Sequence, residues 1–149
     1  MKHNEDILTQ YGLRRSGLAQ TLDMKLISFG KDTVKGRMPW SQKASQGQGL
    51  IHGGALTALA DTTAGVGTFY LAGGAPALTA ELKINFFRNI KQGSVDSEAK
   101  LLHRGKNSMV WEVRLTKTGT KDLLALAIVT CIVLESGASC PMPERKAQK

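Results

Sequence analysis

The second half of the chain alternates apolar and polar residues with a period of two, which predicts β-strands with one buried face. The pattern is clearest over residues 109–115 and recurs over residues 78–87 and 95–101. Residues 123–134 are apolar at nearly every position, as expected of a central strand that is covered on both sides. Only short polar segments separate these strands, so we expect them to form an antiparallel meander.

The first half of the chain predicts two further strands, at residues 22–29 and 33–40, joined by a hairpin turn at residues 30–32. Residues 5–18 place apolar side chains loosely at helical spacing, and we interpret them as a short helix that ends near Gly17. A polar loop rich in Gln, Ser and Gly follows over residues 41–49.

Residues 53–72 predict a long helix that has no charged face. The segment is rich in Ala and Leu, lacks Pro, and has room for about five turns before Gly73 and Gly74 end it. Asp61 is the only residue in it that is charged at neutral pH, whereas a surface helix has a charged face. We therefore expect an α+β fold in which about six antiparallel strands wrap a helix that is buried on nearly all sides.

Length and composition fit one domain. The chain has 149 residues, 42% hydrophobic and 21% charged, and we expect a single domain over residues 1–149 with a core at about 12–134 and a flexible basic tail at 137–149. No apolar run approaches the roughly 20 residues that cross a bilayer, and the first residues lack the apolar core of a secretory signal. Two cysteines make neither a disulfide framework nor a four-ligand zinc site. We expect a cytoplasmic protein that does not associate with membranes.

A net charge of +8 at pH 7 suits nucleic acid, a membrane surface or a small molecule with several phosphates. Outside the tail the basic residues are scattered, and aromatic residues make up only 5% of the chain, too few for a base-stacking platform. A solvated surface that keeps the protein soluble explains the charge equally well. His3 and His103 lack a second ligand at metal-binding spacing, so we expect no metal.

A glycine-rich segment over residues 46–54 precedes the long helix, but it matches neither a dinucleotide-binding fingerprint nor a phosphate-binding P-loop. It ends in His52-Gly53-Gly54, where the free N–H groups of a helix start attract negative charge and two glycines permit a close approach. The alternative interpretation is a glycine pair that only packs against a neighbouring element.

Asp61 is costly in an apolar helix unless it is paired or faces a cavity. It is either hydrogen-bonded to nearby backbone or acts as a general base or nucleophile in a cleft. About 12 Å along the helix axis separates Asp61 from Gly53, so one helix cannot present both residues to one reacting carbon. Two antiparallel helices from two subunits can.

These residues resemble the hotdog-fold acyl-coenzyme A thioesterases, and among them the phenylacetate-degradation branch. The resemblance rests on Gly49-x-x-His52-Gly53-Gly54 and on Asp61, nine residues after the histidine. Residues 77–88 are similar to the strand that follows the helix in this family, and residues 103–107 are similar to its turn facing coenzyme A. Together the similar segments span residues 12–134.

The resemblance implies a dimer with active sites between subunits, often paired into a tetramer. It implies that Asp61 is the catalytic carboxylate, that the Gly53 N–H polarises the thioester carbonyl, and that His52 orients the loop. The resemblance also implies that Thr79 helps to hold the attacking water, and that Gln46 stands where the family usually has Asn, with an amide one methylene longer. Candidates for binding the phosphates of coenzyme A, unless they are only solvated turn residues, are Arg88, Arg104, Gly105, Lys106 and Asn107.

We therefore expect hydrolysis of an acyl- or aryl-coenzyme A thioester to the acid and free coenzyme A, with no metal or other cofactor, since coenzyme A is part of the substrate. The main alternative is a hotdog protein that binds an acyl thioester or fatty acid without turnover, because Gln46 displaces the amide. Nucleic-acid binding and a hydroxyacyl-thioester dehydratase are weaker alternatives. The sequence does not indicate the acyl group.

Overall fold

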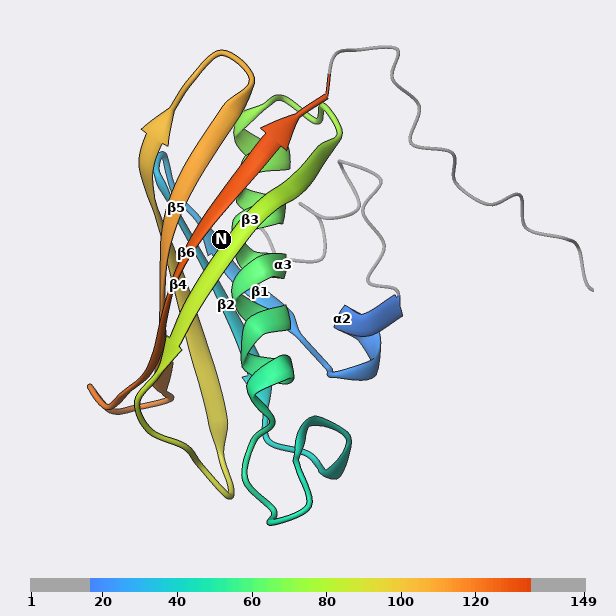
Figure 1. Ribbon diagram of the computed structural model, residues 1–149, viewed down its shortest axis with the longest axis vertical. Coiled ribbons are helices and arrows are strands. Elements are labelled where there is room, and N and C mark those ends of the chain that lie inside the picture. Colours follow the sequence, from blue (N-terminus) through green and yellow to red (C-terminus); the bar gives the residue numbers. More distant parts are fainter. Residues whose placement is uncertain (1–16, 135–149) are drawn as a thin grey trace, which may run out of the picture.

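The computed structural model describes residues 17–134, in which one long helix packs against one face of an antiparallel sheet (Figure 1). The helix is α3 (Gly53–Leu71), and the sheet has six strands in the order β1-β2-β4-β5-β6-β3. In that order the strand bounds are Lys25–Phe29, Thr33–Pro39, Ser94–Arg104, Ser108–Lys117, Leu123–Val133 and Ala77–Phe86. A short helix, α2 (Gly17–Thr21), and a 3-10 turn, η1 (Gln42–Ala44), lie before α3.

The helix and all six strands occur where the sequence predicts them, with small changes at their ends. The long helix ends one residue early, and Gly73 and Gly74 follow it at φ values of 67° and 90°, which favour glycine. The first strand begins at Lys25 because Leu22 still donates its N–H to the α2 carbonyl of Leu18. α2 begins at Gly17, where a helix was predicted to end; residues 5–16 of that predicted helix and the predicted tail lie outside the described residues.

The predicted four-strand meander is wrong in its first step, because β3 does not pair with β4. Strands β4, β5 and β6 pair in succession, but β3 pairs with the far edge of β6, and β4 has β2 as its other neighbour. The connection from β3 to β4 has backbone partners of its own: Phe87 donates to the Leu124 carbonyl, and the Ile90 carbonyl accepts from Ile51. Because these backbone groups have hydrogen-bond partners, a short connection can link two strands that are not neighbours in the sheet.

A β-bulge in β3 changes which side chains share a face. Thr79 pairs with Cys131 and Glu81 pairs with Thr130, so Ala80 is an extra residue in the strand. Strict alternation places Thr79 on the outer face with Glu81. The bulge instead places Thr79 on the helix-facing side with Leu82, because both residues pair with fully buried positions of β6.

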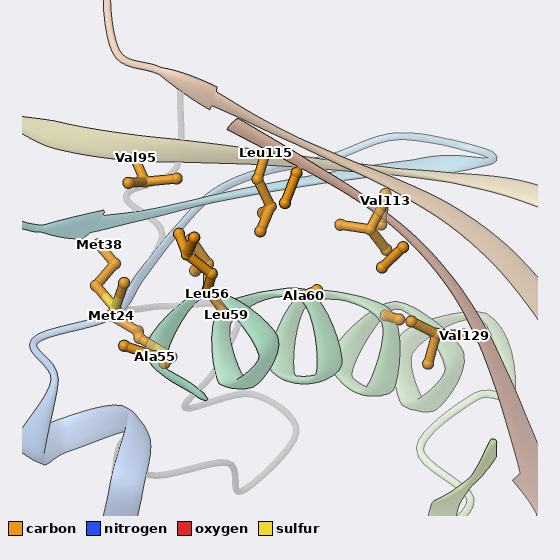
Figure 2. Packing of buried hydrophobic residues seen from close by; sticks show 14 of the residues in the cluster. Met24, Met38, Ala55, Leu56, Leu59, Ala60, Val95, Val113, Leu115 and Val129 are labelled. Atoms are coloured by element: carbon orange, nitrogen blue, oxygen red, sulfur yellow. The ribbon is translucent and has the colours of Figure 1, made fainter. Parts of the chain in front are cut away.

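The core fills the space between α3 and the sheet, and apolar side chains of the helix point toward those of the strands (Figure 2). At its centre the fully buried Trp111 donates its indole N–H to Thr68 Oγ1 at 2.8 Å. The same ring lies against Gly67, where an added Cβ would be 2.9 Å from Trp111 Cη2. A larger residue at position 67 has no room.

Burial of α3 is one-sided rather than nearly complete, which corrects the prediction. Its buried face carries Leu56, Leu59 and Ala64, whereas the opposite face, which includes Asp61, Gly65 and Val66, is only half-buried. The outer face of β6 is also open, with Ile128 and Ile132 exposed by 37% and 43%. Within one chain, therefore, both α3 and β6 are less buried than their apolar sequences predict.

We predict that Gly67→Ala lowers the free energy of unfolding by about 1–3 kcal/mol, because the added methyl group overpacks the core against Trp111. Gly65→Ala is the matched control: nothing lies within 4 Å of its added Cβ, so helix propensity predicts a gain of about 0.5–1 kcal/mol. Urea denaturation of both variants measures the difference. Equal stability of the two variants would show that the ring contact does not constrain the helix.

Candidate active site

The candidate site begins at the N-terminus of α3, where His52 caps the helix. His52 is extended, at φ −71° and ψ 136°, and its Nδ1 accepts a hydrogen bond from the Gly54 N–H at 2.8 Å. Its own N–H donates to the Ala44 carbonyl, which fixes the preceding loop. Within residues 17–134 the Gly53 N–H has no partner, as expected at the first position of a helix. This N–H is available to an oxygen atom of a ligand.

Gln46 lies in the loop before the helix and uses half of its amide to brace that loop. Its Oε1 accepts from the Gln48 N–H, and its backbone N–H donates to the Leu50 carbonyl. Trp40 holds the loop from outside by donating its indole N–H to the Gly49 carbonyl at 3.0 Å. The amide nitrogen of Gln46 keeps two N–H donors, so this side chain can act on a ligand as a donor.

Asp61 meets Thr79 across the gap between α3 and β3. The Thr79 hydroxyl donates to Asp61 Oδ1 at 2.5 Å, and Asp61 is half-buried on the side of α3 away from the core. The two residues are 18 positions apart, and the bulge at Ala80 is what turns the hydroxyl toward the carboxylate. Of the residues proposed for catalysis, the structure thus brings Asp61 and Thr79 into contact.

Cys131 is a neighbour of this pair to which the sequence assigns no role, because it lies in the apolar run over residues 123–134. It is fully buried, and its Sγ lies 3.9 Å from Thr79 Oγ1. Burial raises the pKa of the Cys131 thiol, and the nearby Asp61 acts in the same direction, whereas the hydroxyls of Thr68 and Thr79 oppose the shift. The thiol therefore stays protonated at neutral pH and is no thiolate nucleophile.

Gly53 and Asp61 remain apart within one chain, as the helix arithmetic predicts. They lie about two turns apart on the same helix, separated by about 12 Å along its axis. A hollow of about 290 Å³ lies instead over Lys35 and Arg37, and another of similar size lies beside Arg88. Neither hollow is lined by Gly53 or Asp61.

The candidate phosphate-binding residues fall at opposite ends of the molecule. Arg88 follows β3 near the start of α3 and bonds Asp122 at 3.1 Å, whereas Arg104 donates to the carbonyl of Leu71 at the other end of α3 at 2.8 Å (Figure 1). Gly105, Lys106 and Asn107 form the turn beside Arg104; the Gly105 N–H donates to Ser108, and the Asn107 carbonyl accepts from Val133. One chain cannot bring both ends to the same ligand group.

Residues 17–134 hold no group of three or more His, Cys, Asp or Glu side chains placed to bind a metal ion. Among the helices of the same part of the chain, none is long and apolar enough to span a membrane.

Comparison with known proteins identifies the family. The sequence profile of the thioesterase superfamily matches residues 48–123, just over half of the chain, including the His52-Gly53-Gly54 segment and Asp61. The 1,4-dihydroxy-2-naphthoyl-CoA hydrolase of Escherichia coli is 30% identical over 95 residues, which is 63% of this chain and 70% of that protein.

Solved structures share the fold. A thioesterase from Staphylococcus aureus superposes with a TM-score of 0.75 at 27% identity, covering 79% of this chain and 98% of its own. Its solved variants replace a glutamine and a glutamate that are 15 positions apart, the spacing that also separates Gln46 from Asp61. The PaaI protein of the Escherichia coli phenylacetic acid degradation operon gives a TM-score of 0.75 at 22% identity, covering 88% and 91% of the two chains.

These matches agree with the architecture described above, a long helix against a six-stranded antiparallel sheet. They confirm the predicted hotdog fold and the predicted enzyme class, a thioester hydrolase. The chain belongs to the thioesterase superfamily.

Proposed function

We propose that this protein hydrolyses acyl-coenzyme A thioesters by attack of water that Asp61 activates. The observation that carries the proposal is the Asp61–Thr79 hydrogen bond on the half-open side of α3, in a chain of the thioesterase superfamily. A carboxylate that accepts one hydroxyl bond keeps lone pairs to orient a water molecule and to take its proton. Thr79 holds the carboxylate and offers its oxygen to the same water.

The chemistry that follows needs an oxyanion donor and a proton for the leaving group. Water attacks the thioester carbonyl carbon while its proton moves to Asp61, and the oxyanion that forms accepts from the Gly53 N–H. The amide N–H groups of Gln46 are placed in the loop before Gly53 and serve as a second donor. Breakage of the C–S bond then releases the thiol, which takes the proton from Asp61, and the carboxylic acid.

The site is completed by a second subunit. About 12 Å separates Gly53 and Asp61 along one helix, so each site combines Asp61 of one chain with the partner subunit's Gly53. The face of α3 away from the core is half-buried and carries one charged residue, Asp61. A second copy that packed on this face would bury it, which supports the arrangement. A dimer also allows Arg88 of one chain and the Arg104 turn of another to approach one nucleotide. We propose a homodimer, further paired as a tetramer, acting in the cytoplasm.

An aryl-coenzyme A thioester is the substrate class that the comparisons favour. A relative at 30% identity is named as a hydrolase of a naphthoyl-CoA, and a structural neighbour belongs to a phenylacetic acid operon. We accordingly place the chain in the phenylacetate-degradation branch. Turnover of benzoyl- and phenylacetyl-CoA, compared with aliphatic thioesters, distinguishes this proposal from binding without hydrolysis.

Asp61→Asn should lower kcat by about 10²- to 10⁴-fold, the usual contribution of a general base, because the amide cannot accept the proton of water. The fold should persist, since the amide is nearly isosteric and can still accept from Thr79. Steady-state hydrolysis and thermal unfolding measure both effects. Activity within threefold of the unmodified protein would remove Asp61 from the mechanism.

Gly53→Pro should abolish most of the activity by deleting the backbone N–H that serves the oxyanion, a loss of about 10²- to 10³-fold in kcat. Proline is well tolerated at the first position of a helix, and the extended backbone of His52 suits the residue before a proline. Gly53→Ala is the matched control, because it keeps the N–H and its Cβ meets the same Phe86 ring at 3.3 Å. Equal activities of the two variants would contradict the role of this N–H.

Mixing Asp61→Asn with Gly53→Pro should restore activity if sites are shared between subunits. Each hybrid dimer holds one doubly damaged site and one intact site, so random exchange restores about a quarter of the unmodified rate. Hydrolysis measured after subunit exchange, with hybrids verified by native mass spectrometry, gives the test. Verified hybrids without activity would exclude a shared site.

A further inference from the structure

A chain of polar side chains connects the centre of the core to Asp61. Trp111 on β5 donates to Thr68 on α3 at 2.8 Å, and Thr79 on β3 donates to Asp61 at 2.5 Å. Between the two hydroxyls lies the fully buried Cys131 of β6, 3.9 Å from Thr79 Oγ1. The cysteine is thus the one buried polar group of β6 that touches the proposed catalytic pair.

The number of available hydroxyl and thiol protons determines which atom donates in the contact between Cys131 and Thr79. The Thr79 hydroxyl has one proton, which goes to the Asp61 carboxylate, an acceptor when ionised. The Thr68 hydroxyl also has one proton, which goes to the Ala64 carbonyl at 3.0 Å. The thiol, which stays protonated, holds the one remaining proton of the group. Thr79 Oγ1 has no proton left for the sulfur and keeps a lone pair, so in the 3.9 Å contact the thiol is the donor. Thr68 Oγ1, which accepts from Trp111, also keeps a lone pair and is the competing acceptor for the thiol proton.

We propose that Cys131 is a positioning residue for hydrolysis: its thiol donates to Thr79 Oγ1 and so holds the Thr79 hydroxyl proton on Asp61. A threonine side chain rotates about χ1, and a hydrogen bond that its oxygen accepts from the neighbouring strand fixes one rotamer. A hydroxyl that accepts a hydrogen bond is also a stronger donor. The proposal rests on the proposed function, because it assigns Cys131 a role through Asp61 and Thr79.

Kinetics of a double-mutant cycle test this role. Cys131→Ala should lower kcat about three- to tenfold, which corresponds to the free energy of one weak hydrogen bond, with KM unchanged within twofold. In a Thr79→Val background, which keeps the shape but lacks the hydroxyl, the same change should have almost no effect. Val129→Ala is the matched control, since Val129 is the preceding helix-facing residue of β6, is fully buried, and pairs with Leu82 rather than Thr79. Its effect should be equal in both backgrounds.

The S–H stretching band in the Raman spectrum tests the hydrogen bond without any turnover. The measurement uses full-length Cys140→Ala protein, so that Cys131 is the one thiol. Thr79→Val should move the band to higher frequency, as a donor that loses its acceptor does. A band that does not move, or a Cys131→Ala effect on kcat that is equal with and without Thr79, would overturn the proposal. If Asp61→Asn left hydrolysis unchanged while Thr79→Val still moved the S–H band, the proposed function would be contradicted and the hydrogen bond from Cys131 would stand.

Discussion

In β3 one extra residue, Ala80, decides which side chain reaches the helix, and the candidate site depends on that register. With the bulge, Thr79 pairs with the buried Cys131 and its hydroxyl contacts Asp61. Without it, Thr79 would share the outer face with Glu81, and Asp61 would lose its one side-chain partner among residues 17–134. A carboxylate that remains half-buried and unpaired is costly, so the bulge both stabilises the acid and places the hydroxyl beside it.

The two faces of α3 have different roles, because one packs in the core and the other carries Asp61. Toward the sheet, Gly67 and Thr68 admit the large ring of Trp111 and satisfy its N–H, which fixes the height of α3 over the strands. On the side away from the buried core, the helix presents Asp61, its one charged side chain, to Thr79 of the edge strand β3. Its N-terminus leaves the Gly53 N–H free because His52 caps Gly54 instead. One chain therefore holds the proposed base and the proposed oxyanion donor about 12 Å apart along the helix, and the proposed mechanism brings them together across two chains.

Periodicity predicts the elements of this fold well, because the cause of each element is local. The uncharged run from Gly53 and the alternation around Trp111 suffice for the helix and the central strand. The pairing of β3 with β6 and the bulge at Ala80 are not predictable in this way, since both depend on strands that lie far away in the sequence. The same dependence on distant strands hides the contact between Cys131 and Thr79 from sequence reasoning. The motif that carries Gly53 and Asp61 is recognisable from its spacing alone.

The central claim is that one thioester carbonyl lies between Asp61 of one subunit and the partner subunit's Gly53. A crystal structure with a non-hydrolysable ketone analogue of phenylacetyl-CoA measures this directly. We expect the ketone oxygen at about 2.7–3.1 Å from the Gly53 nitrogen of one subunit, with the Asp61 carboxylate of the other subunit facing the ketone carbon through one water molecule. A ketone bound away from Gly53, or a single chain that supplies both groups, would contradict the account.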